Sequence, residues 1–235
     1  MKEAMFVNKW MVILLTILGG NMSACALDGS SSWKEEVLLH DGQKIIVERS
    51  VTRRGRHELG QRPPIGEQYL TFTMPGTGKV VRWEDEYSED VGSANFNLLM
   101  LDILGGVAYL VGSPMGCLPY NKWGRPNPPY VIFKFQGSEW KRINIQELPA
   151  ELKKPNLIIS SPDDGAKQAI GGLVPAEVVN ELNTGFKQPQ YQTVLHEPLE
   201  PKLLEVGCDE LVYYKGAWVA PGNSIGRRMM DRLSK

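Results

Sequence analysis

An acidic run at residues 84–90, Glu-Asp-Glu-Tyr-Ser-Glu-Asp, is the densest group of side chains with chemical potential. Two carboxylates that face one cleft can act as general acid and base, as in many glycoside hydrolases. Asp85, Glu86, Glu89 and Asp90 are the candidates for hydrolysis of an envelope polymer. The run lacks the spacing and the glycine of an EF-hand loop, so a solvated loop and a cation or basic-partner surface are the other interpretations.

Other motif fragments do not complete a catalytic or metal site. Residues 76–79, Gly-Thr-Gly-Lys, lack the spacing of a phosphate-binding loop and lead into the extended run from Val80. His40, His57 and His196 show no metal-ligand spacing, and no Gly-x-Ser-x-Gly elbow is present. The sequence therefore indicates no cofactor, no metal site and no catalytic residue of these types.

A stiff aromatic stretch at residues 120–130, Tyr-Asn-Lys-Trp-Gly-Arg-Pro-Asn-Pro-Pro-Tyr, is the candidate for partner binding. Aromatic and arginine side chains supply much of the energy at interfaces, and prolines limit the entropy lost on docking. Tryptophan and tyrosine rings also suit stacking on sugars. We expect Tyr120, Trp123, Arg125 and Asn127 to contact a protein or glycan. The alternative is a rigid crossover that packs Trp123 into the core.

Net charge argues against nucleic acid as a partner. Residues 1–24 carry Lys2, Lys9 and Glu3 of the 26 basic and 27 acidic side chains, so their removal leaves 24 and 26 and a formal charge of −2. General nucleic-acid binding requires a strong basic excess. The local basic cluster, Arg-Arg-Gly-Arg-His at residues 53–57, is open to three interpretations: a solvated loop, pairing with the acidic run, or contact with anionic lipid headgroups or glycans.

The first residues have the pattern of a secretory signal. Lys2 and Lys9 precede the apolar run at residues 11–18, and Gly19-Gly20-Asn21 ends it. About ten apolar residues span only about 15 Å as a helix, whereas the hydrocarbon core of a bilayer is roughly 30 Å thick. The pattern thus favours a cleaved leader over a permanent transmembrane anchor.

The end of this leader, Met22-Ser23-Ala24-Cys25, resembles the lipobox of bacterial lipoproteins. Met22 stands where the family usually has Leu. The resemblance implies cleavage before Cys25 and acylation of that residue, with anchoring in the membrane through its lipid. Ala26 in place of Asp implies transport to the outer membrane, facing the periplasm. An ordinary secretion signal with a coincidental cysteine is the alternative.

The mature chain is also similar to a set of uncharacterised proteobacterial lipoproteins. The similar segments are Gly-Ser-Ala-Asn-Phe at residues 92–96 and Lys-Trp-Gly-Arg-Pro-Asn-Pro-Pro-Tyr at residues 122–130, and the resemblance covers roughly residues 33–160. It implies no particular activity. The first expectation for function is a lipid-anchored cell-envelope protein that acts as a non-enzymatic binding or assembly module. The envelope-polymer hydrolase is the alternative.

With Cys25 assigned to lipid, Cys117 and Cys208 remain of the three cysteines. An even pair in an oxidising compartment predicts a disulfide, and two free buried thiols are the alternative. The bond would close a loop of about 90 residues, which the chain-entropy model values at roughly 4–5 kcal/mol.

The mature sequence predicts a mainly β fold: an antiparallel sandwich, a barrel-like sheet or a partial propeller. Five hairpins are expected, with turns near residues 41–42, 75–78, 105–106, 136–139 and 215–216. The hairpin around residues 105–106 is apolar on both faces, which favours a central position.

Helices are expected to be one or two and short. The candidates are residues 175–182 and the basic tail from 223 or 224 to 235, with a turn or two at residues 148–154. We divide the chain into a signal peptide (1–24), a lipidated cysteine with a flexible tether (25–32) and one β-rich domain (33–235).

Overall fold

The computed structural model describes residues 29–202 and 207–233. The expected leader, Cys25 and the first part of the tether lie outside the described residues. The expected end of the tether is wrong, because residues 30–32 already pair with residues 50–52 of the next strand. Strand β1 therefore begins at Ser30, three residues before the expected start of the β-rich domain at residue 33.

Five strands form the first sheet, in the spatial order β4-β3-β2-β1-β9. All neighbours are antiparallel except β1 and β9, which run in parallel. The predicted hairpins near residues 41–42 and 75–78 are confirmed as β1–β2 and β3–β4. The strands are β1 (Ser30–Leu38), β2 (Lys44–Arg53), β3 (Ile65–Thr73), β4 (Val80–Asp85) and β9 (Leu173–Val174).

Four antiparallel strands form the second sheet in the order β5-β6-β7-β8, and a separate hairpin pairs β10 with β11. The three remaining predicted hairpins are confirmed. Aromatic pairs lie opposite each other in two of them, Phe135 with Trp140 and Tyr213 with Trp218. The strands are β5 (Phe96–Leu104), β6 (Val107–Pro114), β7 (Val131–Gln136), β8 (Glu139–Ile143), β10 (Val212–Tyr214) and β11 (Ala217–Val219).

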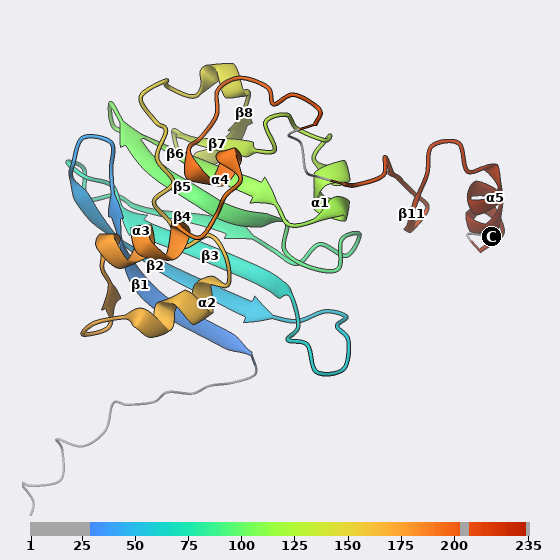
Figure 1. Ribbon diagram of the computed structural model, residues 1–235, viewed down its shortest axis with the longest axis horizontal. Helices are drawn as coiled ribbons and strands as arrows, with labels where there is room; N and C mark the ends of the chain where they lie inside the picture. The colour runs from blue at the N-terminus through green and yellow to red at the C-terminus, as the bar shows by residue number, and fades with distance from the viewer. Residues whose placement is uncertain (1–28, 203–206, 234–235) are drawn as a thin grey trace, which may run out of the picture.

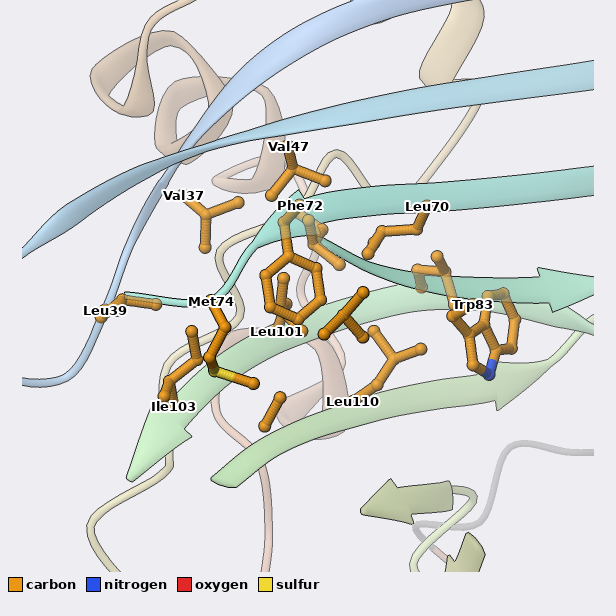
Figure 2. Close-up of a cluster of buried hydrophobic side chains, with 14 of the residues drawn as sticks. Val37, Leu39, Val47, Leu70, Phe72, Met74, Trp83, Leu101, Ile103 and Leu110 are labelled. Atoms are coloured by element: carbon orange, nitrogen blue, oxygen red, sulfur yellow. The ribbon is translucent and has the colours of Figure 1, made fainter. Parts of the chain in front are cut away.

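The two larger sheets pack face to face, so the fold is a β sandwich (Figure 1). Strands β1, β2 and β4 alternate buried and exposed residues, which points one face of the first sheet inward and the other outward. Figure 2 shows the core between the sheets. Its buried members from the first sheet include Val37, Val47, Leu70, Phe72 and Trp83, and those from the second include Leu98, Leu101, Ile103 and Leu110.

A bulge in β5 lets both ends of this strand contribute to the core. The register with β6 shifts between Leu98 and Met100. Phe96 and Leu98 lie before the shift and Leu101 and Ile103 after it, yet all four belong to the core between the sheets. One extra residue in a strand reverses its alternation, which explains the change of phase.

The outer face of the second sheet is covered by two segments, residues 145–159 and residues 186–195, which we call the cover. Leu148, Leu152, Ile159 and Val194 from this cover pack against buried side chains of β5, β6 and β7, among them Met100, Val111 and Ile132. The prediction that β5 and β6 are apolar on both faces is confirmed. β6 is central, but β5 is an edge strand of its sheet.

Residues 156–159 run along the free edge of β5. The backbone N–H groups of Asn156 and Leu157 donate to the carbonyl of Leu99 at 3.0 and 3.1 Å. The Asn156 amide accepts from the Leu101 N–H at 2.9 Å and donates to the carbonyls of Leu101 (2.9 Å) and Leu38 (3.0 Å). Asn156 thus caps the edge of β5 and links it to β1 of the other sheet.

Five short helices accompany the sheets in the described residues, more than expected. The predicted helices are confirmed as α3 and α5. Residues 148–154 contain one turn, which the Leu152 N–H closes on the Pro149 carbonyl at 3.0 Å, and no helix. The helices are α1 (Cys117–Lys122), α2 (Pro162–Gly165), α3 (Ala176–Asn183), α4 (Pro189–Gln192) and α5 (Ser224–Leu233), with 3-10 turns at Ile145–Glu147 and Ala166–Gln168.

A buried carboxylate at α2 attaches this part of the chain to the end of β2. Arg53 donates to both oxygens of Asp163, at 2.9 and 2.7 Å, and Arg62 donates to Oδ2 at 2.5 Å. Burial by itself would raise the pKa of Asp163, but the hydrogen bonds and charges of the two arginines outweigh it and lower the pKa to about 2. The ionised form is therefore the one that the fold stabilises.

We predict that Asp163→Asn lowers the free energy of unfolding by at least about 2 kcal/mol at neutral pH, because the carboxylate titrates lower in the folded chain than in the unfolded one. The contribution is complete above the unfolded pKa of 3.8 and is lost as the pH falls toward 2. Denaturant unfolding across this pH range measures the difference. Asp164→Asn is the matched control and should change little, because Asp164 pairs at the surface. An equal loss in both variants would contradict the prediction.

Candidate functional site

The predicted binding stretch lies in the crossover from β6 to β7. Gly116 precedes α1 with a φ of 83°, a backbone conformation that suits glycine. The N–H of Tyr120 bonds to the Gly116 carbonyl, and the N–H of Trp123 closes the helix on the Pro119 carbonyl. The chain then turns back through Arg125, at a φ of 52°, toward β7.

Trp123 packs against the core between the sheets. Its ring centroid lies 4.8 Å from that of Phe96 and 6.1 Å from that of Phe133. The indole N–H donates to the Asn95 amide oxygen at 3.1 Å, and the Arg142 guanidinium lies over the ring at 5.4 Å. This arrangement matches the rigid-crossover interpretation of Trp123.

Arg125 and Asn121 hold the chain that follows Cys208. Arg125 donates to the carbonyls of Cys208 and Asp209, each at 3.0 Å, and lies over the Tyr120 ring. Asn121 donates to the Asp209 carbonyl at 3.0 Å and accepts from the Leu211 N–H at 2.9 Å. The predicted disulfide between Cys117 and Cys208 is present and joins the first residue of α1 to the same segment.

Asn127 makes a similar two-point contact with another segment. Its amide donates to the Leu199 carbonyl at 2.9 Å and accepts from the Leu199 N–H at 2.7 Å. The polar groups of Trp123, Arg125 and Asn127 are therefore engaged within the chain. Direct contact of these residues with a partner stays a prediction.

A surface hollow of about 330 Å³ lies beside the disulfide, and Tyr120 is the one predicted binding residue that lines it. The other lining residues come from the β6 end, the crossover and α4: Ser113, Pro114, Gly116, Pro129, Gln188, Gln190, Tyr191 and Gly207, together with both disulfide cysteines. We call this the crossover hollow. Its wall combines two tyrosines, two glutamines and a hydroxyl group.

Gln190 in the wall of the crossover hollow has an unusual side chain. The residue is buried, and its Oε1 has no hydrogen-bond partner among the described residues. A buried polar atom without a partner costs free energy, so its retention calls for an explanation such as a ligand or water. The sequence pattern missed Gln188, Gln190 and Tyr191, because residues 188–201 have the prolines of a connector.

The acidic run does not form a pair of facing carboxylates. Asp85 is buried at the end of β4, and its oxygens accept from Gln68 Nε2, Asn95 Nδ2 and the N–H groups of Asn95 and Phe96. Burial raises the pKa of Asp85, and these hydrogen bonds offset part of the rise.

The other carboxylates of the acidic run lie in different environments. Asp90 pairs with Lys122 at 2.7 Å, whereas Glu86 and Glu89 are exposed. This pairing and the burial of Asp85 fit a structural loop more closely than a hydrolytic centre.

The basic cluster and the histidines are also dispersed. Arg53 binds Asp163, while Arg54 pairs with Glu67 and lies 4.2 Å over the ring of Tyr87 in the acidic run. His40 contacts Asp102 at 2.7 Å, and this hydrogen bond raises the pKa of His40 despite its partial desolvation. Within residues 29–202 and 207–233, no three His, Cys, Asp or Glu side chains are placed to hold a metal ion.

Comparison with known proteins yields no relative: no family model, no curated protein and no solved structure matches the chain. In the part of the chain that the structure describes, no helix is both long and apolar enough to cross a membrane. The crossover hollow is therefore a candidate site on the basis of its geometry.

We predict that Cys117→Ala with Cys208→Ala lowers the free energy of unfolding, by up to about 4–5 kcal/mol in the chain-entropy model. Amide exchange at residues 207–219 should become faster, because only side-chain hydrogen bonds then hold this segment to α1. Exchange in β5 and β6 should change less. Mass spectrometry after deuterium labelling measures both, and unchanged protection of residues 207–219 would contradict the assignment. Reduction of the unchanged chain is the control and should give the same pattern.

Proposed function

We propose that this protein is a lipid-anchored component of a bacterial cell envelope and that its sandwich serves as a binding or assembly module. The disulfide between Cys117 and Cys208 is the observation that carries the proposal, because such bonds persist in oxidising compartments outside the cytosol. The leader pattern that ends in Cys25 points to the same compartment. The proposed site is the outer membrane on its periplasmic side.

The start of the fold suits a short anchor. Gly29 accepts a hydrogen bond from the N–H of Arg53, so the chain is already part of the domain there. Four residues from Cys25 to Gly29 span at most about 14 Å when fully extended. A lipid on Cys25 would therefore keep this end of the sandwich close to the membrane.

The crossover hollow is the proposed contact for that partner, a protein or a glycan of the envelope. Tyr120 and Tyr191 offer aromatic surface, while Gln188 and Gln190 offer amide groups. This mixture of a few polar groups on an aromatic wall is typical of ligand sites. Gln190, whose buried Oε1 has no partner within the described residues, belongs to this wall.

Cys25→Ser tests the anchor. We expect the variant to lose acylation and to leave the membrane fraction, because the thiol that carries lipid is gone. Fractionation of cells and mass analysis of the N-terminus are the measurements. Met22→Leu, which restores the residue usual in the lipobox, is the control and should be processed normally. If the Cys25→Ser product still fractionates with membranes and is trimmed at the same bond, the anchor is refuted.

Gln190→Met tests partner binding at the crossover hollow without a loss of protein stability. The change keeps the side-chain volume and removes an oxygen that has no partner in the described chain, so the free energy of unfolding should not fall. We expect a photo-crosslinking residue at position 188 to form an adduct in intact cells and Gln190→Met to weaken it severalfold. A crosslinker at residue 58, on an exposed loop, is the control. Equal adducts at both positions, or no effect of Gln190→Met, would count against the hollow.

A further inference from the structure

Helix α5 lies beside the sandwich and packs on the β10–β11 hairpin (Figure 1). Asp231 accepts hydrogen bonds from the Tyr214 hydroxyl at 2.8 Å and from Lys215 at 2.5 Å. The Arg227 guanidinium lies 5.7 Å over the Tyr214 ring. The side of α5 that carries Arg227 and Asp231 is therefore the side that attaches the helix to the protein.

The opposite side of α5 carries apolar and cationic side chains. Ile225, Arg228, Met229 and Arg232 follow the spacing of one helical face. Ile225 is 67% exposed and Met229 58% exposed. Neither Arg228 nor Arg232 has an acidic partner within the described residues; Arg228 only reaches back to the Ser224 carbonyl. We call these four residues the outer face of α5.

A second copy of the chain is a poor occupant for this face. In a two-fold dimer the same patch meets itself, so Arg228 and Arg232 of each copy would face the equivalent arginines. Like charges brought together at an interface cost several kcal/mol. Two apolar side chains from each copy also bury little area compared with a standard interface of about 1,600 Å².

An anionic bilayer fits both properties of the face at once. Helices with apolar residues on one side and arginines beside them lie in the interface plane, with the apolar side chains at the boundary of headgroups and acyl chains. Arginine keeps its guanidinium at the phosphates while its stem covers apolar surface. Each basic residue near such a surface adds electrostatic attraction to the anionic headgroups.

We propose that α5 lies on an anionic bilayer surface through Ile225 and Met229, with Arg228 and Arg232 at the lipid phosphates. This contact is separate from the lipid on Cys25 and does not require it. It gives the protein a second point of attachment, formed by α5.

Fluorescence of Met229→Trp in the full chain tests this contact. The chain is mixed with vesicles whose lipids carry bromine in the acyl chains, either phosphatidylcholine alone or with phosphatidylglycerol. The unchanged chain, with its six native tryptophans, supplies the background. We expect the added tryptophan to be quenched in the anionic vesicles at least severalfold more than in the neutral ones. Ile225→Trp is a second reporter if position 229 does not tolerate the larger ring.

Charge reversal supplies the control. Arg228→Glu with Arg232→Glu should reduce quenching in anionic vesicles to the neutral level, whereas Arg56→Glu with Lys187→Glu, an equal change at exposed positions elsewhere, should not. Attachment by the leader or by the lipid would occur in both kinds of vesicle. Only the difference in quenching at residue 229 between anionic and neutral vesicles therefore tests the contact of α5. Equal quenching in both vesicles, no quenching in either, or a concentration-dependent emission shift without lipid would each overturn the proposal, the last in favour of self-association.

Discussion

The rest of the sandwich depends on the burial of residues 156–159 between its apolar clusters. Leu157 lies in the core between the sheets, Ile158 in a third apolar cluster with Trp33 and Val51, and Ile159 in the cluster beneath the cover. Three consecutive side chains therefore enter three different clusters. A chain that is buried on every side needs all its backbone polar groups satisfied, because water cannot reach them.

Side chains from other parts of the protein satisfy several of these groups. Arg49 donates to the Ile158 carbonyl at 2.9 Å and pairs with Glu35, which also accepts from Trp33. Asn183 of α3 donates to the Leu157 carbonyl and accepts from the Ile159 N–H. Asn156 itself bonds to both sheets. The buried charges on β1 and β2 and the amide on α3 thus form part of one packing arrangement instead of a polar site.

The sequence predicted the local elements and one distant contact, the disulfide between Cys117 and Cys208, but missed the contacts of residues 156–159 and the crossover hollow. Hairpins follow from turn residues and alternation within about ten neighbours, so all five were found, as was α3 with Pro175 at its start. Residues 156–159 do not form a β-strand. Asn156 bonds to Leu101 and Leu38, which are both more than 50 residues away in the sequence. The crossover hollow is lined by residues of α1 and α4, which are far apart in the sequence, and no sequence motif predicts that they share one wall. Tyr120 is the one predicted partner-binding residue that lines the hollow, together with the two predicted disulfide cysteines.

The disulfide has a topological consequence for the chain between its ends. Cys117 and Cys208 make residues 118–207 part of a covalent ring that contains β7, β8 and the whole cover of the second sheet. One peptide bond cut anywhere in that ring leaves both pieces joined by sulfur. A protease that cuts one loop there cannot by itself release the β10–β11 hairpin and α5, because the disulfide still joins the two pieces; their release also requires a thiol reductant.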